Sequence, residues 1–192
     1  MPTVPRLRAA LSAIPAYRPG KAPAAGAGPS YKLSSNENPY PPLASVLEVL
    51  AGADRDINRY PDMFATGLVR RLAERNGLGP DQVVCGTGSV GVLGQVVQAT
   101  CETGDEVVFA WRSFEAYPIV VGVSGARAVR VPLTAGARHD LPAMAAAVTD
   151  RTRLLLVCSP NNPAGPAVHE QEMRELLQEA PSRSRKGARP AV

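Results

Sequence analysis

Histidine, cysteine and aromatic residues are scarce in this chain of 192 residues, and their scarcity excludes several classes of site. The only histidines are His139 and His169. The three cysteines, Cys85, Cys101 and Cys158, are widely spaced and form no CxxC pair. A metal site would lack ligands, and a disulfide framework would leave one thiol unpaired. We therefore expect no metal site, and three reduced, buried cysteines in a cytoplasmic protein.

Acidic residues are absent after Glu179, and this absence locates the charge of the chain. Four basic residues beyond that point account for the whole formal net charge of +4: Arg183, Arg185, Lys186 and Arg189. The basicity therefore belongs to a short tail and not to a folded face that could bind nucleic acid. Long apolar runs are absent too, and none approaches the roughly 20 residues of a membrane-spanning helix. We expect neither a nucleic-acid nor a membrane partner.

What the chain does contain is a regular alternation of helical and strand patterns. The apolar spacing predicts helices at residues 43–53, 64–77, 89–101, 113–125, 140–149 and 169–180. It predicts strands at residues 82–86, 105–110, 126–132 and 153–160. Asp140 is placed as an N-cap and Gly77 as a helix end. The alternation predicts an α/β fold with three layers, α/β/α, around a mostly parallel sheet that is covered on both faces.

Three of the predicted strands end in residues that suit a ligand, and ligands of such sheets gather at the carboxyl ends of the strands. The segment CGTGSVG, residues 85–91, fits G-x-G-x-x-G between a strand and a helix, where backbone N–H groups and the helix dipole favour an anion. Phe114 follows the next strand and could cover a planar ring. The segment SPNNPAG, residues 159–165, offers an asparagine amide that could donate to a ring oxygen.

Each of these strand ends also has a plain structural interpretation. The glycines are compatible with a turn that binds nothing, Phe114 with a core aromatic, and SPNNPAG with an Asn-Pro turn. A dinucleotide-binding oxidoreductase of the Rossmann type is the alternative enzyme class. It predicts a carboxylate at the end of the next strand. Here Asp105 and Glu106 lie at the start of that strand, and SPNNPAG would remain unexplained.

Taken together, the strand ends resemble the large domain of fold-type I enzymes that use pyridoxal phosphate (PLP). The nearest likeness is to class I/II aminotransferases of the histidinol-phosphate and aromatic-amino-acid branch. LSSNENPYPP resembles a motif near that family's substrate entrance, NRYPD its R-Y-P-[DE] element, and SPNNPAG its [NS]-P-N-N-P-T-G. The resemblance runs from about Ile14 to about Ala180. It implies transfer of an amino group between histidinol phosphate or an aromatic amino acid and a 2-oxo acid.

The resemblance also implies residues that bind the cofactor. The backbone N–H groups of Gly88, Ser89 and Val90 would hold the PLP phosphate, with bonds to a charged oxygen worth about 1.5–3 kcal/mol each. Phe114 would stack on the pyridine ring. Asn162 would bond the phenolic oxygen of the ring.

Further residues would act at the substrate entrance or across a dimer. Tyr60 would reach the phosphate of the partner subunit, which implies a homodimer with shared sites. The substrate entrance would be formed by Asn36, Glu37 and Asn38. One departure from the family pattern is Ala164, which replaces the usual threonine of N-N-P-T-G and removes a hydroxyl group behind the asparagine.

Lysine is the scarcity that matters most for this resemblance. A PLP aminotransferase needs a lysine to carry the cofactor and move a proton, and an acid beside the pyridine nitrogen. The chain has only Lys21, Lys32 and Lys186, none of them in the family's S-K-x-x-G context. The D-E-A-Y acid, the substrate-carboxylate arginine and the small domain are not in the sequence either.

These absences lead to an expected domain organisation. We expect an N-terminal arm over residues 1–32, an incomplete PLP-binding large domain over 33–180, and an unrelated basic tail over 181–192. The tail would come from a frameshifted or interrupted gene, and the chain alone would be inactive. A degenerate, non-catalytic chain is the remaining alternative.

Overall fold

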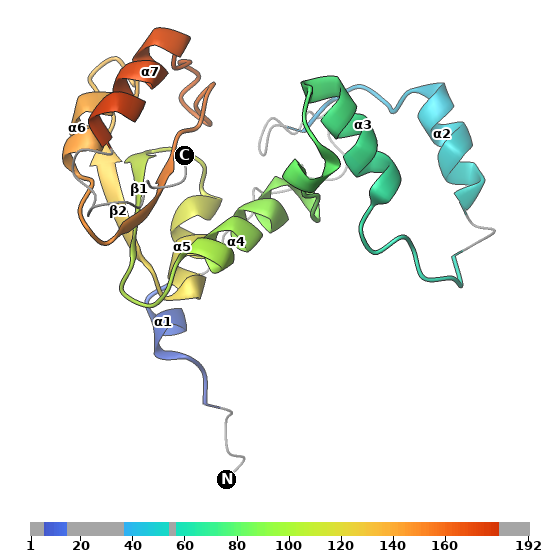
Figure 1. The fold of residues 1–192 in the computed structure, drawn as a ribbon, viewed down its shortest axis with the longest axis horizontal. Coiled ribbons are helices and arrows are strands. Elements are labelled where there is room, and N and C mark those ends of the chain that lie inside the picture. The colour runs from blue at the N-terminus through green and yellow to red at the C-terminus, as the bar shows by residue number, and fades with distance from the viewer. Residues whose placement is uncertain (1–5, 15–36, 54–56, 181–192) are drawn as a thin grey trace, which may run out of the picture. The chain divides into compact units, whose positions relative to one another are not determined.

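A computed structural model describes residues 6–14, 37–53 and 57–180 of the chain (Figure 1). The chain divides into two compact units. One comprises residues 16–85, and the other comprises residues 1–15 together with 86–192. Most of the expected arm and the whole expected tail lie outside the described residues, so the expected boundaries stay predictions.

The second unit is built on a parallel sheet of three strands in the order β2-β1-β3. The strands are β1, Glu106–Trp111; β2, Arg127–Pro132; and β3, Thr152–Leu156. The pairing of β1 with β2 runs from Glu106 opposite Arg127 to Trp111 opposite Pro132. Val107 to Phe109 lie opposite Leu154 to Leu156 of β3. All carboxyl ends of the strands therefore lie at one edge of the sheet.

Helices cover both faces of this sheet, as the three-layer prediction requires (Figure 1). Val107 and Phe109 of β1 pack with side chains of α4, Gly88–Thr100, and α5, Ala116–Ser124. Val108 and Ala110 point to the other face and pack with side chains of α6, Leu141–Ala146, and α7, Glu170–Glu179. Residues 107–110 are fully buried. Burying a Val or Phe side chain stabilises the fold by roughly 1.5–3 kcal/mol, so this strand is the centre of the core.

The two outer strands of the sheet differ in their side chains. β2 carries Arg127 and Arg130, both exposed, and ends at Pro132. β3 carries one exposed cation, Arg153, whose guanidinium lies 3.2 Å from Asp105. Its next residues, Leu154 and Leu155, are buried on opposite faces. β2 thus has the composition of an edge strand and β3 that of an interior strand.

Local signals in the sequence correctly placed several helix ends. The Asp140 carboxyl group accepts a hydrogen bond from the Ala143 backbone N–H at 3.0 Å and caps α6. At the start of α7 the Glu172 carboxylate accepts a hydrogen bond from the His169 N–H at 2.7 Å.

A short helix, α1, Ala9–Ser12, precedes the sheet in sequence. Just before it, Arg8 donates to the Val123 carbonyl at 2.8 Å, at the carboxyl end of α5.

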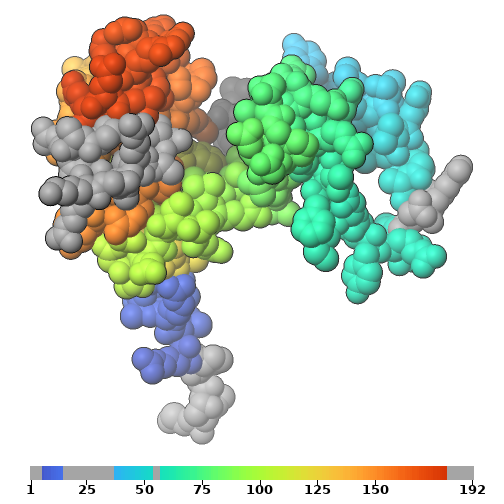
Figure 2. All heavy atoms as spheres, in the orientation of Figure 1, coloured from blue at the N-terminus to red at the C-terminus, as the bar shows by residue number. Residues whose placement is uncertain are grey.

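The unit of residues 16–85 has little core of its own among its described residues. It contains α2, Ala44–Ala51; α3, Thr66–Asn76, which ends at Gly77 in a left-handed conformation; and a 3-10 turn, Pro80–Gln82. Among the described residues of this unit, only Ala73 is buried. Large apolar side chains of α2 are exposed instead, and Figure 2 shows this helix in cyan. They are Val46, Leu47, Val49 and Leu50.

Two predictions from the sequence are wrong. Residues 82–86 do not form a strand: residues 83–86 pair with no described strand, and Val84 is 66% exposed. An apolar run becomes a strand only when a neighbour completes its hydrogen bonds. Burial of all three cysteines is the second error, since Cys101 is buried but Cys85 and Cys158 are only half-buried.

Metal-binding clusters and membrane-spanning helices are absent from the described residues. These residues hold no group of three or more His, Cys, Asp or Glu residues placed to bind a metal ion. None of their helices combines the length and the apolarity needed to cross a bilayer.

Candidate functional site

The glycine-rich turn before α4 uses each glycine for a different physical reason. Gly88 has φ of 73°, a left-handed conformation that side chains rarely adopt. A Cβ atom on Gly86 would lie 3.1 Å from the Val92 side chain. A Cβ atom on Gly91 would lie 2.7 Å from Thr87 Oγ1. Glycine is therefore favoured by conformation at residue 88, and at residues 86 and 91 a Cβ atom would force neighbouring side chains to shift.

The first turn of α4 presents backbone donors to solvent. Gly88, Ser89 and Val90 are all exposed, and no acidic residue lies in this turn. The Gly88 N–H already donates to the Gly86 carbonyl at 2.8 Å. The N–H groups of Ser89 and Val90 belong to the first turn, where a helix provides no internal acceptor. Together with the positive end of a helix of 13 residues, they can bind an anion.

Phe114 combines the two interpretations of its position. The side chain is half-buried and packs against the core on the α4/α5 face of the sheet. Its ring makes an edge contact with Tyr117, with centroids 5.6 Å apart and an interplanar angle of 89°. Tyr117 in turn contacts Phe109 of β1 at 5.4 Å. The ring is thus fixed by aromatic neighbours and still partly accessible, as a stacking surface must be.

The SPNNPAG segment folds into a tight loop after β3. The Asn161 N–H donates to the Pro166 carbonyl at 3.0 Å, and the Gly165 N–H donates to the Asn161 carbonyl at 2.7 Å. At its base the Val168 N–H donates to Ser159 Oγ at 2.9 Å. The loop is therefore fixed by its own hydrogen bonds.

Ser113 and Asn161 connect neighbouring loops, and neither was predicted from the sequence as a site residue. Asn161 is 3% exposed and Ser113 is 1% exposed. Ser113 Oγ donates to Asn161 Oδ1 at 2.7 Å, and Asn161 Nδ2 donates to the Arg112 carbonyl at 3.1 Å. Ser113 immediately precedes Phe114, and Asn161 immediately precedes Asn162, which is half-buried. The only signal in the sequence was the position of Asn161 within SPNNPAG, directly before Asn162.

The other predicted site residues belong to the unit of residues 16–85. Tyr60 is fully exposed, and Glu37 and Asn38 are exposed as well. The Asn38 side chain accepts the Tyr40 N–H at 3.0 Å, which fixes a local turn. Asn36 lies outside the described residues. The roles of these residues at the strand ends stay predictions.

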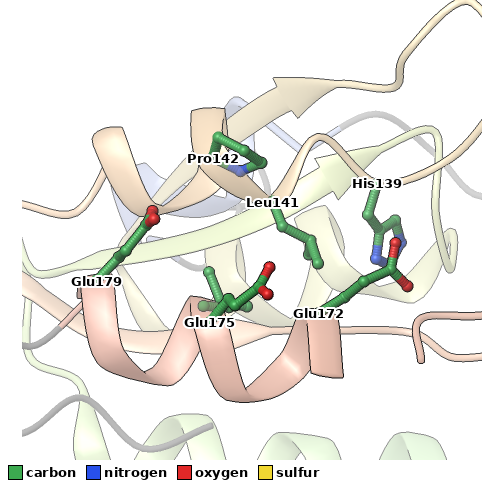
Figure 3. Close-up of a pocket in the computed structure, with 7 residues that line it drawn as sticks. His139, Leu141, Pro142, Glu172, Glu175 and Glu179 are labelled. Carbon is green, nitrogen blue, oxygen red and sulfur yellow. The ribbon is translucent and has the colours of Figure 1, made fainter. Parts of the chain in front are cut away.

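A separate hollow of about 220 Å³ lies between the start of α6 and α7 (Figure 3). Figure 3 shows His139 and Leu141 approaching it from the α6 side, and three glutamates along α7: Glu172, Glu175 and Glu179. The His139 ring is buried beside the Asn161 side chain, although neither ring nitrogen makes a hydrogen bond of good geometry within the described part of the chain. Burial is the main cause that lowers the pKa of His139, and it outweighs the Asn161 side chain, which acts in the opposite direction, so the neutral form of the ring is favoured. The acidic lining makes this hollow unsuited to an anion.

Comparison with known proteins agrees with these features. A model of the family "Aminotransferase class I and II" matches residues 29–185. An aromatic amino acid aminotransferase of Streptomyces avermitilis is 59% identical over 181 residues, which cover 94% of this chain and 50% of that protein. One from Thermobifida fusca is 53% identical, over 92% of this chain and 49% of that protein. This chain thus spans about half the length of the curated relatives it matches.

Solved structures give the same likeness. The histidinol-phosphate aminotransferase of Sinorhizobium meliloti in complex with pyridoxal-5'-phosphate superposes with a TM-score of 0.71 at 30% identity. That superposition covers 78% of this chain and 41% of the other. A tetra mutant of Thermus thermophilus aspartate aminotransferase superposes with a TM-score of 0.68 at 25% identity, over 78% of this chain and 44% of the other.

Proposed function

This chain belongs to the aminotransferase class I and II family, and we propose that it provides the cofactor-binding strand ends of a PLP-dependent aminotransferase for aromatic amino acids. The observation that carries the proposal is the turn at residues 86–91, which combines a left-handed Gly88 with exposed first-turn donors of α4. Support for the substrate class comes from the relatives at 59% and 53% identity, both named aromatic amino acid aminotransferases. Histidinol phosphate is the second candidate substrate, because the Sinorhizobium meliloti enzyme whose structure superposes on this chain is named a histidinol-phosphate aminotransferase.

The residues of the α4 turn and of the loops after β1 and β3 fit the parts of PLP. A phosphate needs several N–H donors and a positive potential, and the first turn of α4 offers both. A planar pyridine ring needs a flat apolar surface, and Phe114 is half-buried and held by Tyr117. A ring oxygen needs a donor, and Asn162 carries an amide in the loop that follows β3. When bound, PLP supplies the electron sink that amino-group transfer requires.

The chain's own residues would then act by binding and orientation. The N–H groups of Ser89 and Val90 hold the phosphate, and each bond to a charged oxygen contributes about 1.5–3 kcal/mol. Phe114 restrains the ring against rotation, and the Asn162 amide fixes the ring oxygen. The contacts to the phosphate at one end of PLP and the Asn162 contact at the ring oxygen together fix the orientation of the ring within the site.

The remaining parts of the proposal concern the substrate and the dimer. Glu37 and Asn38, with Asn36, would line the approach of the amino acid. Tyr60 would donate to the phosphate bound by a second copy of the chain, so the active form would be a homodimer. The exposure of Tyr60 is compatible with such a role across subunits.

A titration tests the phosphate site directly. The purified chain is titrated with PLP and, separately, with pyridoxal, while the fluorescence of its single tryptophan is recorded. Trp111 is the last residue of β1, three residues before Phe114, and its fluorescence should report on binding there. We expect PLP to bind at least tenfold more tightly than pyridoxal, since only PLP carries the phosphate. Equal affinities would contradict the role of the α4 turn.

A further inference from the structure

The Ser113–Asn161 hydrogen bond joins two strand-end loops that lie 48 residues apart in sequence. Both side chains are almost completely buried, and the Ser113 Oγ to Asn161 Oδ1 distance is 2.7 Å. The Asn161 amide nitrogen also donates to the Arg112 carbonyl at 3.1 Å. Asn161 therefore contacts the loop after β1 through both ends of its amide.

The position of this bond relates it to the proposed ligand contacts. Phe114 follows Ser113 directly, and Asn162 follows Asn161 directly. Consecutive Cα atoms lie about 3.8 Å apart, so the bond fixes the backbone one residue before each proposed ring contact. The loop after β3 also has its own internal hydrogen bonds, from Asn161 to Pro166 and from Gly165 to Asn161. The loop after β3 is thus locally defined, and the Ser113–Asn161 bond joins it to the loop after β1.

We propose that Ser113 and Asn161 are positioning residues that set the separation between the Phe114 ring and the Asn162 amide. This inference rests on the proposed function, because it assigns these two loops to opposite parts of one PLP ring. Phe114 would contact the ring face, whereas Asn162 would contact an oxygen in the ring plane. Both contacts can form on the same ring only if the position of one loop relative to the other is fixed to within about 0.5 Å.

The competing explanation is that this bond stabilises the fold without affecting the ligand. A matched control separates the two explanations. Thr149 Oγ1 donates to the Glu106 carboxylate at 2.6 Å, near the opposite, amino-terminal end of β1. Thr149→Ala removes a side-chain hydroxyl that donates to a buried partner, as Ser113→Ala does, together with the bond that this hydroxyl accepts from the Arg151 N–H at 3.2 Å. It does so far along the strand from the proposed site.

The experiment compares Ser113→Ala, Asn161→Ala, Ser113→Thr and Thr149→Ala with the unaltered full chain. PLP affinity is measured from Trp111 fluorescence, affinity for inorganic phosphate by competition, and global stability by urea unfolding. We expect Ser113→Ala and Asn161→Ala to weaken PLP binding about tenfold, equivalent to about 1.4 kcal/mol. Phosphate affinity should stay within twofold, because the α4 turn is unchanged. Ser113→Thr keeps the hydroxyl group and should restore most of the PLP affinity.

The outcomes distinguish this inference from the function on which it rests. Thr149→Ala should lower stability and leave PLP affinity unchanged. If Ser113→Ala behaves in the same way, the bond is purely structural and the inference is overturned while the proposed function stands. If the unaltered chain binds PLP no better than inorganic phosphate, the proposed function and the inference both fall.

Discussion

Glu106 is the charged residue whose removal should cost the most stability. Its carboxylate is fully buried at the start of β1 and accepts three hydrogen bonds. The donors are Arg127 at 2.7 Å, Arg151 at 2.9 Å and Thr149 Oγ1 at 2.6 Å. The substitution Glu106→Gln keeps the size of the side chain and removes its charge, so it tests the electrostatic part of this network.

The structure indicates the size of the effect. Removing one partner of a fully buried ion pair costs about 3–5 kcal/mol. Here the two arginine side chains remain 63% and 61% exposed, so water can solvate their charges once the carboxylate is gone. We therefore expect Glu106→Gln to lower the free energy of unfolding by about 2–3 kcal/mol at pH 7, below that range.

The same network predicts a dependence on pH. Burial opposes ionisation, but the Thr149 hydrogen bond and the two arginines outweigh it and hold the pKa of Glu106 below its usual value. A group whose pKa is lower in the folded state stabilises the fold above its unfolded pKa, and that stability is lost as the pH falls through the folded pKa. The difference between the unaltered chain and Glu106→Gln should therefore shrink as the pH falls below about 4.5 towards 3.

Urea unfolding from pH 7 to pH 3, followed by circular dichroism, measures both effects. Glu170→Gln is the control, because Glu170 pairs with Arg174 on an exposed helix face and should contribute less than about 1 kcal/mol. Equal losses for the two variants at pH 7 would refute the reasoning. So would a Glu106→Gln deficit that stays constant down to pH 3.

Four further predictions concern the site and its surroundings. Gly88→Ala should cost about 1–2 kcal/mol, because residue 88 is left-handed, and it should weaken phosphate binding; urea unfolding and phosphate titration measure the two effects. Asn162→Ala should weaken PLP binding in the tryptophan assay, whereas Ala164→Thr should change it less than twofold. Burial lowers the pKa of His139, so the unaltered chain should lose stability as the pH falls below about 6.5. His139→Gln should abolish this loss, and urea unfolding at several pH values measures it. Borohydride treatment with PLP should leave no stoichiometric adduct on a single lysine by mass spectrometry; one such adduct on Lys186 would contradict this.

The sequence predicted local features of the fold better than features that depend on distant residues. Asp140 as an N-cap and Gly77 as a helix end are confirmed, because each depends on bonds within one turn. The strand at residues 82–86 was wrong, because a ladder depends on a partner that a local pattern does not specify. Burial of Cys85 failed for the same reason, since it lies in that segment.

The candidate site shows the same division. The glycines of residues 86–91 were found because a helix start and its turn are contiguous in sequence. Ser113 and Asn161 were not found, because their bond joins loops that only the parallel pairing of β1 with β3 brings together. The pattern SPNNPAG drew attention to its second asparagine, and the structure adds the buried first one.

The difference between the two outer strands bears on how the chain behaves in concentrated solution. Exposed arginines and a terminal proline on β2 discourage another chain from adding to that side. β3 lacks such protection beyond Arg153, and within the described residues it pairs only with β1. Its outer N–H and C=O groups are a template for strand addition beside the buried Leu154 and Leu155. Self-association and aggregation should therefore start at β3, and solubility depends on what covers that side of the sheet.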